Sequence, residues 1–287
     1  MHPTPSQEVI DTQVKNALAE DIGTGDLTAG LINISERATA TLISREAAVV
    51  CGNDWIAATF RMLDSSIQID FRVADGDSIG AGEIWCVVSG PARSILTAER
   101  TALNFAQLLS GTATVVRSMV AELEGTNARL LDTRKTIPGL RLAQKYAVRC
   151  GGGSNHRVGL YDGILLKENH IRSAGSIRRA VESALKAADA VSLIEVEVEN
   201  LDELAEALAA GAPRILLDNF SLDELRRAVS MTKGQAELEA SGNVTLETIR
   251  EIALTGVDFI SCGQITKNVK ATDLSLQFEI ARDSTSH

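Results

Sequence analysis

The chain has 287 residues, enough for one large domain or two moderate ones. Hydrophobic residues make up 45% of it, which supports a sizeable core, and 38 acidic against 28 basic residues give a formal net charge of −10. This charge disfavours a duplex nucleic-acid protein, which would show a broad basic face, and an aromatic content of 3% disfavours a base-stacking platform. We therefore expect no nucleic-acid partner.

No apolar run approaches the length of a membrane span, and residues 1–13 hold no apolar signal core. We therefore expect no membrane association and a cytoplasmic location. The cysteines are widely spaced with no CxxC pair, so a structural zinc site is not supported. We expect free thiols in a reducing compartment at Cys51, Cys86, Cys150 and Cys262.

The N-terminal part of the chain predicts a small α+β domain. Helical spacing runs over residues 7–20, and residues 37–50 are rich in β-branched and small apolar residues, as strands are. A helix is predicted over Asn53–Leu63. Strand-like pieces follow at 67–73 and 84–90, separated by a turn-rich segment.

A long helical pattern begins at Leu96 and leads into a part of the chain with a different organisation. There, short apolar runs alternate with helical patterns, which indicates βαβ units and a parallel sheet. So many successive units favour a closed α/β barrel over an open sheet. The predicted strands are Arg129–Thr133, Gly163–Lys167, Ser192–Val198, Arg214–Asp218, Ala236–Ala240 and Asp258–Cys262, and the predicted helices are Pro138–Arg149, Ser176–Ala188, Leu201–Ala209, Leu222–Ser230 and Leu246–Leu254.

Nine of the 28 basic residues, but only three of the 38 acidic ones, lie between Arg129 and Arg172. Such a basic island in an acidic chain indicates a pocket for small, multiply charged anions. Planar guanidinium groups can bind carboxylates with two hydrogen bonds, whereas lysines act as point charges. The candidates of these two kinds are Arg134, Arg141 and Arg157, and Lys135 and Lys167.

Charged residues recur where the predicted strands end. Asp132, Lys167 and Asp218 each end an apolar run, and Glu195 and Glu197 share one face of another because strand side chains alternate. In α/β barrels the carboxyl ends of the strands form the rim on which active sites are built. We therefore expect these side chains to converge, although ordinary strand-end and helix-capping residues would give the same pattern.

Glu197 and Asp218 lie at the same inferred rim as the cations, where a site for carboxylates alone would not need them. They are understandable if a divalent cation or ribose hydroxyls must also be held. The alternative is that they form salt bridges to Lys135 or Lys167.

His156 follows the glycine-rich run Gly151–Asn155, which either lets backbone approach a ligand or simply stops a helix. The imidazole could donate a hydrogen bond to a ligand oxygen. Neither a dinucleotide nor a P-loop fingerprint is present. Backbone amides at loops that follow strands bind phosphate, and the residues so placed are Ser241, Gly242, Asn243 and Gly263.

Several strings closely resemble the nicotinate-nucleotide pyrophosphorylase family, also called the quinolinate phosphoribosyltransferases. They include DTRKTIPGLR, QKYAVRCGGGSNHRVGLYDGILLKENH, EVEVE, ILLDNF, EASGNV and GVDFISCGQITK, with EDIGTGDLT, DGDSIGAGE and AERTALNFAQLLSGTAT upstream, so the resemblance spans nearly the whole chain. It implies an α/β fold with an N-terminal α+β sandwich domain over residues 1–112 and an incomplete, TIM-like α/β barrel over 113–269. It also implies that segment 270–287 packs back near the first domain, and that the protein is a homodimer with shared active sites.

The family joins quinolinate to phosphoribosyl pyrophosphate with Mg²⁺, giving nicotinate mononucleotide, pyrophosphate and carbon dioxide in de novo NAD biosynthesis. The resemblance implies that Lys135 lies near the pyrophosphate and the reacting centre, and that Glu197 and Asp218 meet the ribose hydroxyls and the metal. The phosphate would lie against Ser241, Gly242, Asn243 and Gly263. Quinolinate would be bound by Arg134, Arg141, His156, Arg157 and Lys167, with Arg100 reaching in from the partner subunit.

One departure follows Gly263, where the chain reads Gln264-Ile265-Thr266-Lys267-Asn268 and many relatives begin with Ala-Leu-Thr. It leaves the details of this phosphate-side loop open. Two rivals share the scaffold, a phosphoribosyltransferase acting on nicotinate and a molybdenum-transport-associated protein. A third is a carrier module, because residues 67–93 resemble biotinyl and lipoyl domains, but that segment has no lysine to carry the group.

Overall fold

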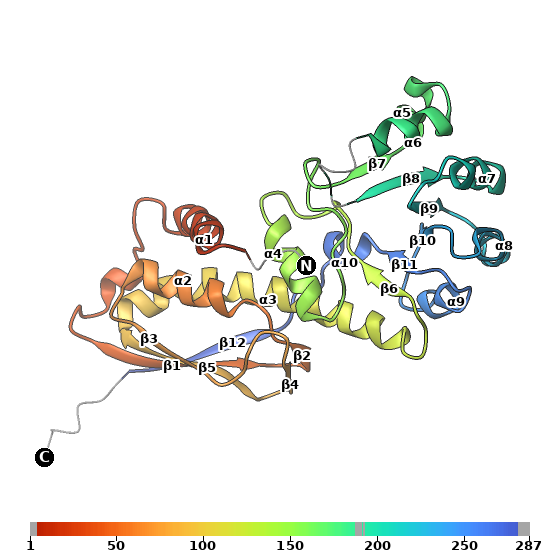
Figure 1. Ribbon diagram of the computed structural model, residues 1–287. Coiled ribbons are helices and arrows are strands. Elements are labelled where there is room, and N and C mark those ends of the chain that lie inside the picture. The colour runs from red at the N-terminus through yellow and green to blue at the C-terminus, as the bar shows by residue number, and fades with distance from the viewer. Residues whose placement is uncertain (1–4, 187–190, 192, 281–287) are drawn as a thin grey trace, which may run out of the picture. The chain divides into compact units, whose positions relative to one another are not determined.

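The computed structural model describes residues 5–186, 191 and 193–280 (Figure 1). The chain divides into two compact units, the first comprising Met1–Val115, Pro138–Gly152 and Val269–His287 and the second Val116–Ile137 and Gly153–Asn268. Residues 138–152 group with the first unit by their contacts, whereas the sequence analysis placed them in the barrel segment 113–269. Their contacts are tertiary ones that a linear pattern does not encode.

The first unit is built on an antiparallel sheet with the strand order β12-β1-β5-β3. Strand β1 alternates between exposed and buried residues, so one face of the sheet is apolar. Phe60, Trp85 and Ile95 belong to the core that this face forms with helices α2 and α3. The strands are β1 (Arg37–Ser44), β3 (Gln68–Phe71), β5 (Ile84–Pro91) and β12 (Leu274–Ile280), and the helices are α2 (Asn53–Leu63) and α3 (Ala92–Glu122).

Strand β12 comes from the far end of the chain and pairs with β1, with Leu276 opposite Leu42. Residues 281–287, which end the segment expected to pack near this domain, lie outside the described residues. The predicted strand over 37–50 is interrupted after Ser44, and its last part pairs with a short strand inside the turn-rich segment. The remaining elements of the unit are α1 (Gln7–Ile22), a 3₁₀ turn (Ala29–Leu31), β2 (Ala48–Val49), β4 (Ser78–Ile79) and α4 (Arg141–Cys150).

The second unit holds a six-stranded parallel sheet in the order β6-β11-β10-β9-β8-β7. From β7 to β11 neighbours in sequence are neighbours in space, and β6 then joins β11 at the far edge. Within the described residues β6 and β7 are not paired, so the sheet is a barrel left open on one side, as expected for an incomplete barrel. Its strands are β6 (Arg129–Leu131), β7 (Ile164–Leu166), β8 (Ile194–Val198), β9 (Arg214–Asp218), β10 (Glu237–Ser241) and β11 (Phe259–Ser261).

Each strand from β7 to β11 is followed by a helix, and side chains at three helix starts explain where these helices begin. Ser176, Asn200 and Ser221 each accept a hydrogen bond from a backbone N–H in the first turn. The helices are α5 (Glu168–Ala174), α6 (Ile177–Leu185), α7 (Leu201–Ala209), α8 (Leu222–Thr232), α9 (Ile249–Ala253) and α10 (Gln264–Lys267). Residues 187 and 188 of one predicted helix and Ser192 of one predicted strand lie outside the described residues.

Helices α5 and α10 were not predicted, because each is too short to show a periodic pattern. In the part of the chain that the structure describes, no helix combines the length and apolar character needed to cross a membrane.

Candidate active site

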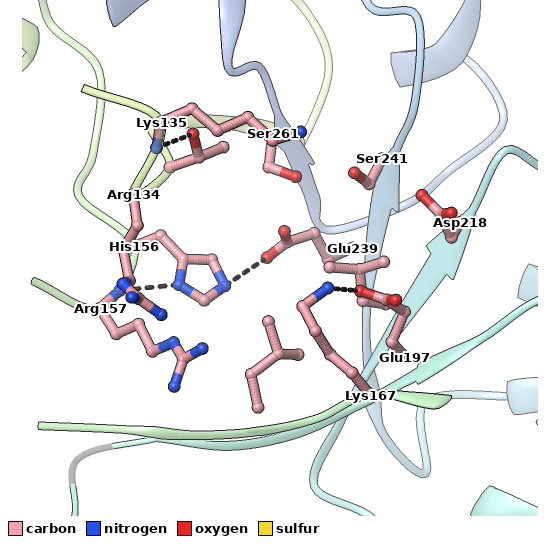
Figure 2. Close-up of a pocket in the computed structure, with 13 residues that line it drawn as sticks. Arg134, Lys135, His156, Arg157, Lys167, Glu197, Asp218, Glu239, Ser241 and Ser261 are labelled. Carbon is pink, nitrogen blue, oxygen red and sulfur yellow. Dashed lines mark hydrogen bonds and ion pairs between the residues drawn. The ribbon is translucent and has the colours of Figure 1, made fainter. Parts of the chain in front are cut away.

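A cavity of about 280 Å³ lies in the second unit, at the carboxyl ends of the parallel strands (Figure 2). Cationic and anionic side chains from several strands meet in it, as the rim hypothesis predicted. Its lining residues are Thr133, Arg134, Lys135, His156, Arg157, Leu165, Lys167, Glu197, Leu216, Asp218, Glu239, Ser241 and Ser261.

The cationic side of the cavity comes from the segments after β6 and β7. Arg157 is anchored because its Nη1 donates to the carbonyl oxygen of Gly163 at 2.9 Å. Burial, followed by the charge of Arg134, lowers the pKa of Arg157. The positive charges of the two guanidinium groups repel each other, so a bound dianion would lower this electrostatic repulsion.

Lys135 is positioned through its backbone. Its N–H donates to Thr133 Oγ1 at 3.0 Å, and its carbonyl accepts from Thr266 Oγ1 at 2.8 Å. A side chain added at Gly263 would crowd both Lys135 and Thr133. The segment after Gly263 is the helix α10 rather than a loop, and its Thr266, which the relatives' Ala-Leu-Thr pattern shares, holds the backbone of the lysine predicted to lie at the reacting centre.

Two carboxylates form the opposite side of the cavity, Glu197 on β8 and Asp218 at the end of the neighbouring strand β9. Lys167 Nζ forms an ion pair with Glu197, which is one of the salt bridges that the sequence left open as an alternative. Burial, followed by the charge of Glu197, raises the pKa of Asp218. Asn219 Nδ2 donates to Asp218 Oδ2 at 2.8 Å and fixes its orientation.

Three of the predicted phosphate-binding residues lie where β10 ends. Ser241 is the last residue of the strand and lines the cavity, and Gly242 and Asn243 form the turn that follows. Gly242 has φ +106° and Asn243 has φ +49°, both in the region that favours residues without a bulky side chain. A Cβ at Gly242 would collide with the side chain of Asn219. Gly263 likewise follows a strand, β11, and precedes α10 without lining the cavity.

Two predicted site residues lie in the first unit. Arg100 is exposed on α3, and Arg141 is the first residue of α4. Neither belongs to the lining of the cavity in the second unit. Their roles remain predictions.

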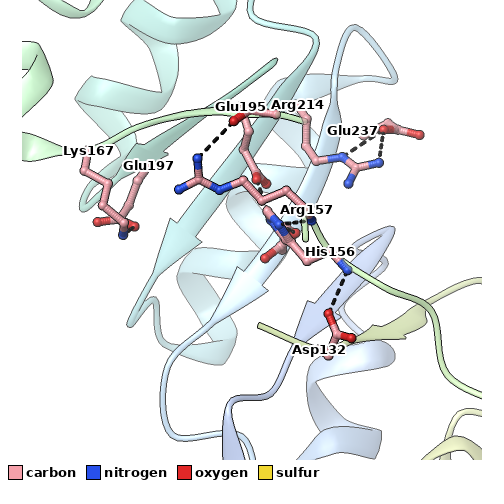
Figure 3. A network of polar contacts seen from close by, with 10 residues as sticks. Asp132, His156, Arg157, Lys167, Glu195, Glu197, Arg214 and Glu237 are labelled. Atoms are coloured by element: carbon pink, nitrogen blue, oxygen red, sulfur yellow. Dashed lines mark hydrogen bonds and ion pairs between the residues drawn. The ribbon is translucent and has the colours of Figure 1, made fainter. Parts of the chain in front are cut away.

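His156 contacts protein groups through both ring nitrogens (Figure 3). Nδ1 accepts the backbone N–H of Arg157 at 2.7 Å, and Nε2 lies 2.8 Å from Glu195 Oε2. Because Nδ1 is an acceptor, the ring proton lies on Nε2 and is donated to Glu195. His156 therefore lines the cavity, but in this arrangement its only N–H points to a protein carboxylate rather than to a ligand.

Two buried glutamates form the floor of this cavity, Glu195, which the sequence placed on one strand face with Glu197, and Glu239, which the sequence reasoning missed. Glu195 and Glu239 are fully buried, and Glu195 Oε1 and both carboxylate oxygens of Glu239 have no hydrogen-bond partner among the described residues, although Glu239 Oε2 lies 3.5 Å from His156 Nε2. Burial raises the pKa of Glu195 to about 7, and burial together with the charge of Glu195 raises the pKa of Glu239 to about 8. Glu239 stands two residues before Ser241, so the alternation of strand side chains was the signal that could have placed it inside.

Asp132 also has a role different from the one expected of it. It is buried and accepts hydrogen bonds from Asn155 Nδ2 at 2.6 Å and from the His156 N–H at 2.9 Å. It is not part of the cavity lining. Asp132 instead holds the loop that carries His156 and Arg157 in place.

Comparison with family models matches both parts of the chain. Residues 26–110 match the quinolinate phosphoribosyl transferase N-terminal domain, and residues 112–277 match the C-terminal domain of the same family. The two matches together cover nearly all of the described residues.

Individual relatives agree with the family models. The chain is 43% identical over 265 residues to a probable nicotinate-nucleotide pyrophosphorylase (carboxylating) of Bacillus subtilis, covering 92% of each protein. Among solved structures it is similar to the nicotinate-nucleotide pyrophosphorylase of Francisella tularensis, with 50% identity, a TM-score of 0.91, and coverage of 96% of this chain and 98% of that one. The corresponding enzyme of Ehrlichia chaffeensis is 39% identical with a TM-score of 0.89, and the match covers 93% of this chain and 98% of that one.

Proposed function

The chain belongs to the quinolinate phosphoribosyltransferase family, and on that premise we propose that it converts quinolinate and phosphoribosyl pyrophosphate to nicotinate mononucleotide, pyrophosphate and carbon dioxide in NAD biosynthesis. The observation that carries the proposal is that four cations and two rim carboxylates line one cavity, together with the buried Glu239. A dicarboxylate and a polyphosphate together bring several negative charges, which this set of cations can offset. The cations are Arg134, Lys135, Arg157 and Lys167, and the carboxylates are Glu197 and Asp218.

Quinolinate would lie against the guanidinium groups of Arg134 and Arg157. Both line the same side of the cavity, and the hydrogen bond to Gly163 holds Arg157 there before any ligand arrives (Figure 2). A preorganised, bidentate donor pair favours a planar dicarboxylate over a substrate with one carboxylate. Lys167 would add a further charge once its pairing with Glu197 loosens.

The phosphoribosyl group would lie across the opposite side. Glu197 and Asp218 would accept hydrogen bonds from ribose hydroxyls, and Ser241 and Ser261, at the ends of β10 and β11, line the same cavity. Lys135 would meet the departing pyrophosphate. Gly242, Asn243 and Gly263 would bring backbone amides toward phosphate, as proposed from the resemblance.

The donor set also fits Mg²⁺, because this ion is commonly held by one or two carboxylates together with substrate phosphates. Glu197 and Asp218 would hold it, and a bound Mg²⁺ would offset charge on the pyrophosphate. Titration of the phosphoribosyl pyrophosphate complex with Mg²⁺, in the native chain and in Asp218→Asn, tests this assignment independently of turnover.

In the reaction, the ring nitrogen of quinolinate forms a bond to the anomeric carbon of the ribose while the bond from that carbon to the pyrophosphate oxygen breaks. The sugar passes through an oxocarbenium-like state, which the carboxylates of Glu197 and Asp218 stabilise electrostatically. When the adjacent carboxylate then leaves as carbon dioxide, its bonding electron pair stays on the ring carbon, where the neighbouring positive nitrogen stabilises it, and a proton from solvent binds to that carbon through this pair. No residue needs to act as a covalent nucleophile.

The assay that tests this function contains the purified chain with quinolinate, phosphoribosyl pyrophosphate and Mg²⁺. We expect carbon dioxide release and nicotinate mononucleotide formation only when all three are present. Turnover with nicotinate in place of quinolinate, with no carbon dioxide, would instead favour the nicotinate-specific rival.

We further propose that the protein acts as a homodimer and that Arg100 serves the cavity of the partner subunit. Mixing an Arg100→Ala chain with an Arg157→Ala chain distinguishes the possibilities, because a mixed dimer then contains one complete site only if Arg100 acts across the interface. Regained activity on mixing supports the proposal, and inactivity of the mixed dimers contradicts it.

Arg141→Ala in the same assay tests the remaining predicted substrate contact, and cell fractionation tests the expected cytoplasmic location.

A further inference from the structure

A second cluster of reactive side chains lies in the first unit, where the proposed reaction makes no use of it. The sulfur atoms of Cys51 and Cys150 and a carboxylate oxygen of Asp75 all lie within 4.8 Å of one another. Cys51 is fully buried between β2 and α2, whereas Cys150 ends α4 and is partly exposed. All four cysteines of the chain are free thiols in this structure.

Asp75 is already committed to other partners, which argues against reading the cluster as a metal site. Its Oδ1 accepts the N–H groups of Gly52 and Asn53 at 3.0 and 3.1 Å, at the start of α2. Its Oδ2 accepts the hydroxyl of Tyr146 at 2.9 Å. Asp75 thus caps the start of α2 and is hydrogen-bonded to Tyr146 of α4. The two thiols are the members of the cluster whose function is still to be explained.

The two thiols differ in a way that suits an attacking and a resolving cysteine. A hydrogen bond from Cys51, as the largest influence, lowers the pKa of Cys150, and the charge of Arg149 acts in the same direction. Burial raises the pKa of Cys51 well above its usual value. The partly exposed sulfur is therefore the one that forms a thiolate and meets reagents, and the buried one lies beside it.

We propose that Cys51 and Cys150 form a reversible disulfide in the presence of a small-molecule disulfide such as glutathione disulfide. The Cys150 thiolate attacks one sulfur of the reagent, breaks its S–S bond and releases one small thiol. Cys51 then gives up its proton, and its sulfur attacks Cys150, displacing the second small thiol. The two cysteines lose two electrons and two protons in total, and the reagent becomes two thiols.

The closure needed is small. A disulfide bond is about 2 Å long, and the sulfurs start within 4.8 Å of each other. The remaining cysteines serve as internal controls, because Cys86 and Cys262 are buried and burial raises the pKa of each, that of Cys86 to about 12.

The test equilibrates the full-length native chain in glutathione buffers of stepped ratio, traps free thiols with an alkylating reagent, and maps the peptides by mass spectrometry. We expect a linked Cys51–Cys150 peptide pair that rises as the buffer becomes more oxidising and disappears with dithiothreitol. Cys86 and Cys262 should remain alkylated as free thiols throughout.

Single variants identify the order of events. Cys51→Ser should stop at a mixed disulfide between glutathione and Cys150, while Cys150→Ser should leave Cys51 free, and Cys51→Ala gives the same readout if the serine variant folds poorly. Cys86→Ser should behave like the native chain. The proposal is overturned if the native chain gives no linked pair in buffers that oxidise the denatured chain, or if Cys86 or Cys262 is modified to the same extent as Cys150.

Discussion

The rim and the floor of the barrel cavity both concentrate charged side chains, but they treat those charges in opposite ways. At the rim, Lys167 pairs with Glu197, and the side chains keep contact with solvent, with Lys167 48% exposed. In the floor, Glu195 and Glu239 are buried away from water, and some of their carboxylate oxygens accept no hydrogen bond. Burial raises the pKa values of both groups toward neutrality. Charged side chains at the rim can therefore bind ligands, whereas the buried carboxyl groups of the floor affect how the stability of the fold depends on pH.

We expect the largest effect on ligand binding when a cation of the rim is removed. Arg157→Ala removes charge-assisted hydrogen bonds worth about 1.5–3 kcal/mol each, so the dissociation constant of quinolinate should rise by roughly a hundredfold or more. Calorimetric titration with quinolinate measures it. Arg172→Ala is the matched control, because Arg172 is an exposed arginine paired with Glu168 on α5. Unchanged affinity in Arg157→Ala would remove this arginine from the site.

The buried glutamates of the floor should instead affect the pH dependence of the free energy of unfolding. Glu239 titrates at about 8 in the folded chain, above the ordinary value of 4.5, so folding favours its protonated form. The folded state therefore binds more protons between these limits, and stability is lost as pH rises from about 4.5 through about 8. Relative to Glu239→Gln, which cannot ionise, the native chain should lose on the order of 5 kcal/mol of unfolding free energy across this range.

Urea unfolding of both proteins at several pH values measures that difference. The groups facing Glu239 are Glu195, His156, Ser261 and Arg214, and all of them remain in the variant. Equal pH profiles for the two proteins would show that Glu239 is not held protonated by the fold.

A smaller effect should follow from the contact between His156 and Glu195. Glu195→Ala leaves the buried Nε2–H of His156 without its acceptor, at a cost of about 1–3 kcal/mol in unfolding free energy, whereas Glu195→Gln keeps an oxygen there. Nitrogen chemical shifts of the His156 ring report the tautomer directly. Because Nδ1 still accepts the Arg157 N–H, the ring proton should stay on Nε2 in both variants, and only the alanine variant should lose stability. Equal stability of the two variants would show that the contact between His156 and Glu195 contributes nothing to folding.

Much of the fold was predictable because local signals agreed with one another. The run RILLD at Arg214–Asp218 is buried in the middle and polar at its end, and Ser221 with Glu224 forms the capping box that starts the next helix. The short helices α5 and α10 gave no periodic signal. The grouping of residues 138–152 with the first unit depends on contacts between distant parts of the chain, which no spacing encodes.

The rim of the site was likewise predictable, since its residues end strands of a parallel sheet. Glu239 was not recognised, because a glutamate inside a strand usually indicates an exposed face, and the complete burial of Glu195 and Glu239 is visible only in the structure. The hydrogen-bonding of His156 could not be inferred either. It depends on where the backbone of Arg157 and the carboxylate of Glu195 lie in space.

The smallest effect we predict lies at the edge of the rim, in the turn after β10. Gly242→Ala both strains a backbone at φ +106° and pushes against Asn219, which orients Asp218. Gly211→Ala is the matched control, because its φ of +76° imposes similar backbone strain while its new Cβ meets nothing within 4 Å. Both variants should lose about 1–2 kcal/mol of stability, but only Gly242→Ala should raise the KM for phosphoribosyl pyrophosphate, by a few-fold. Equal KM values in the two variants would place the turn outside the substrate site and reduce the rim to the side chains that line the cavity.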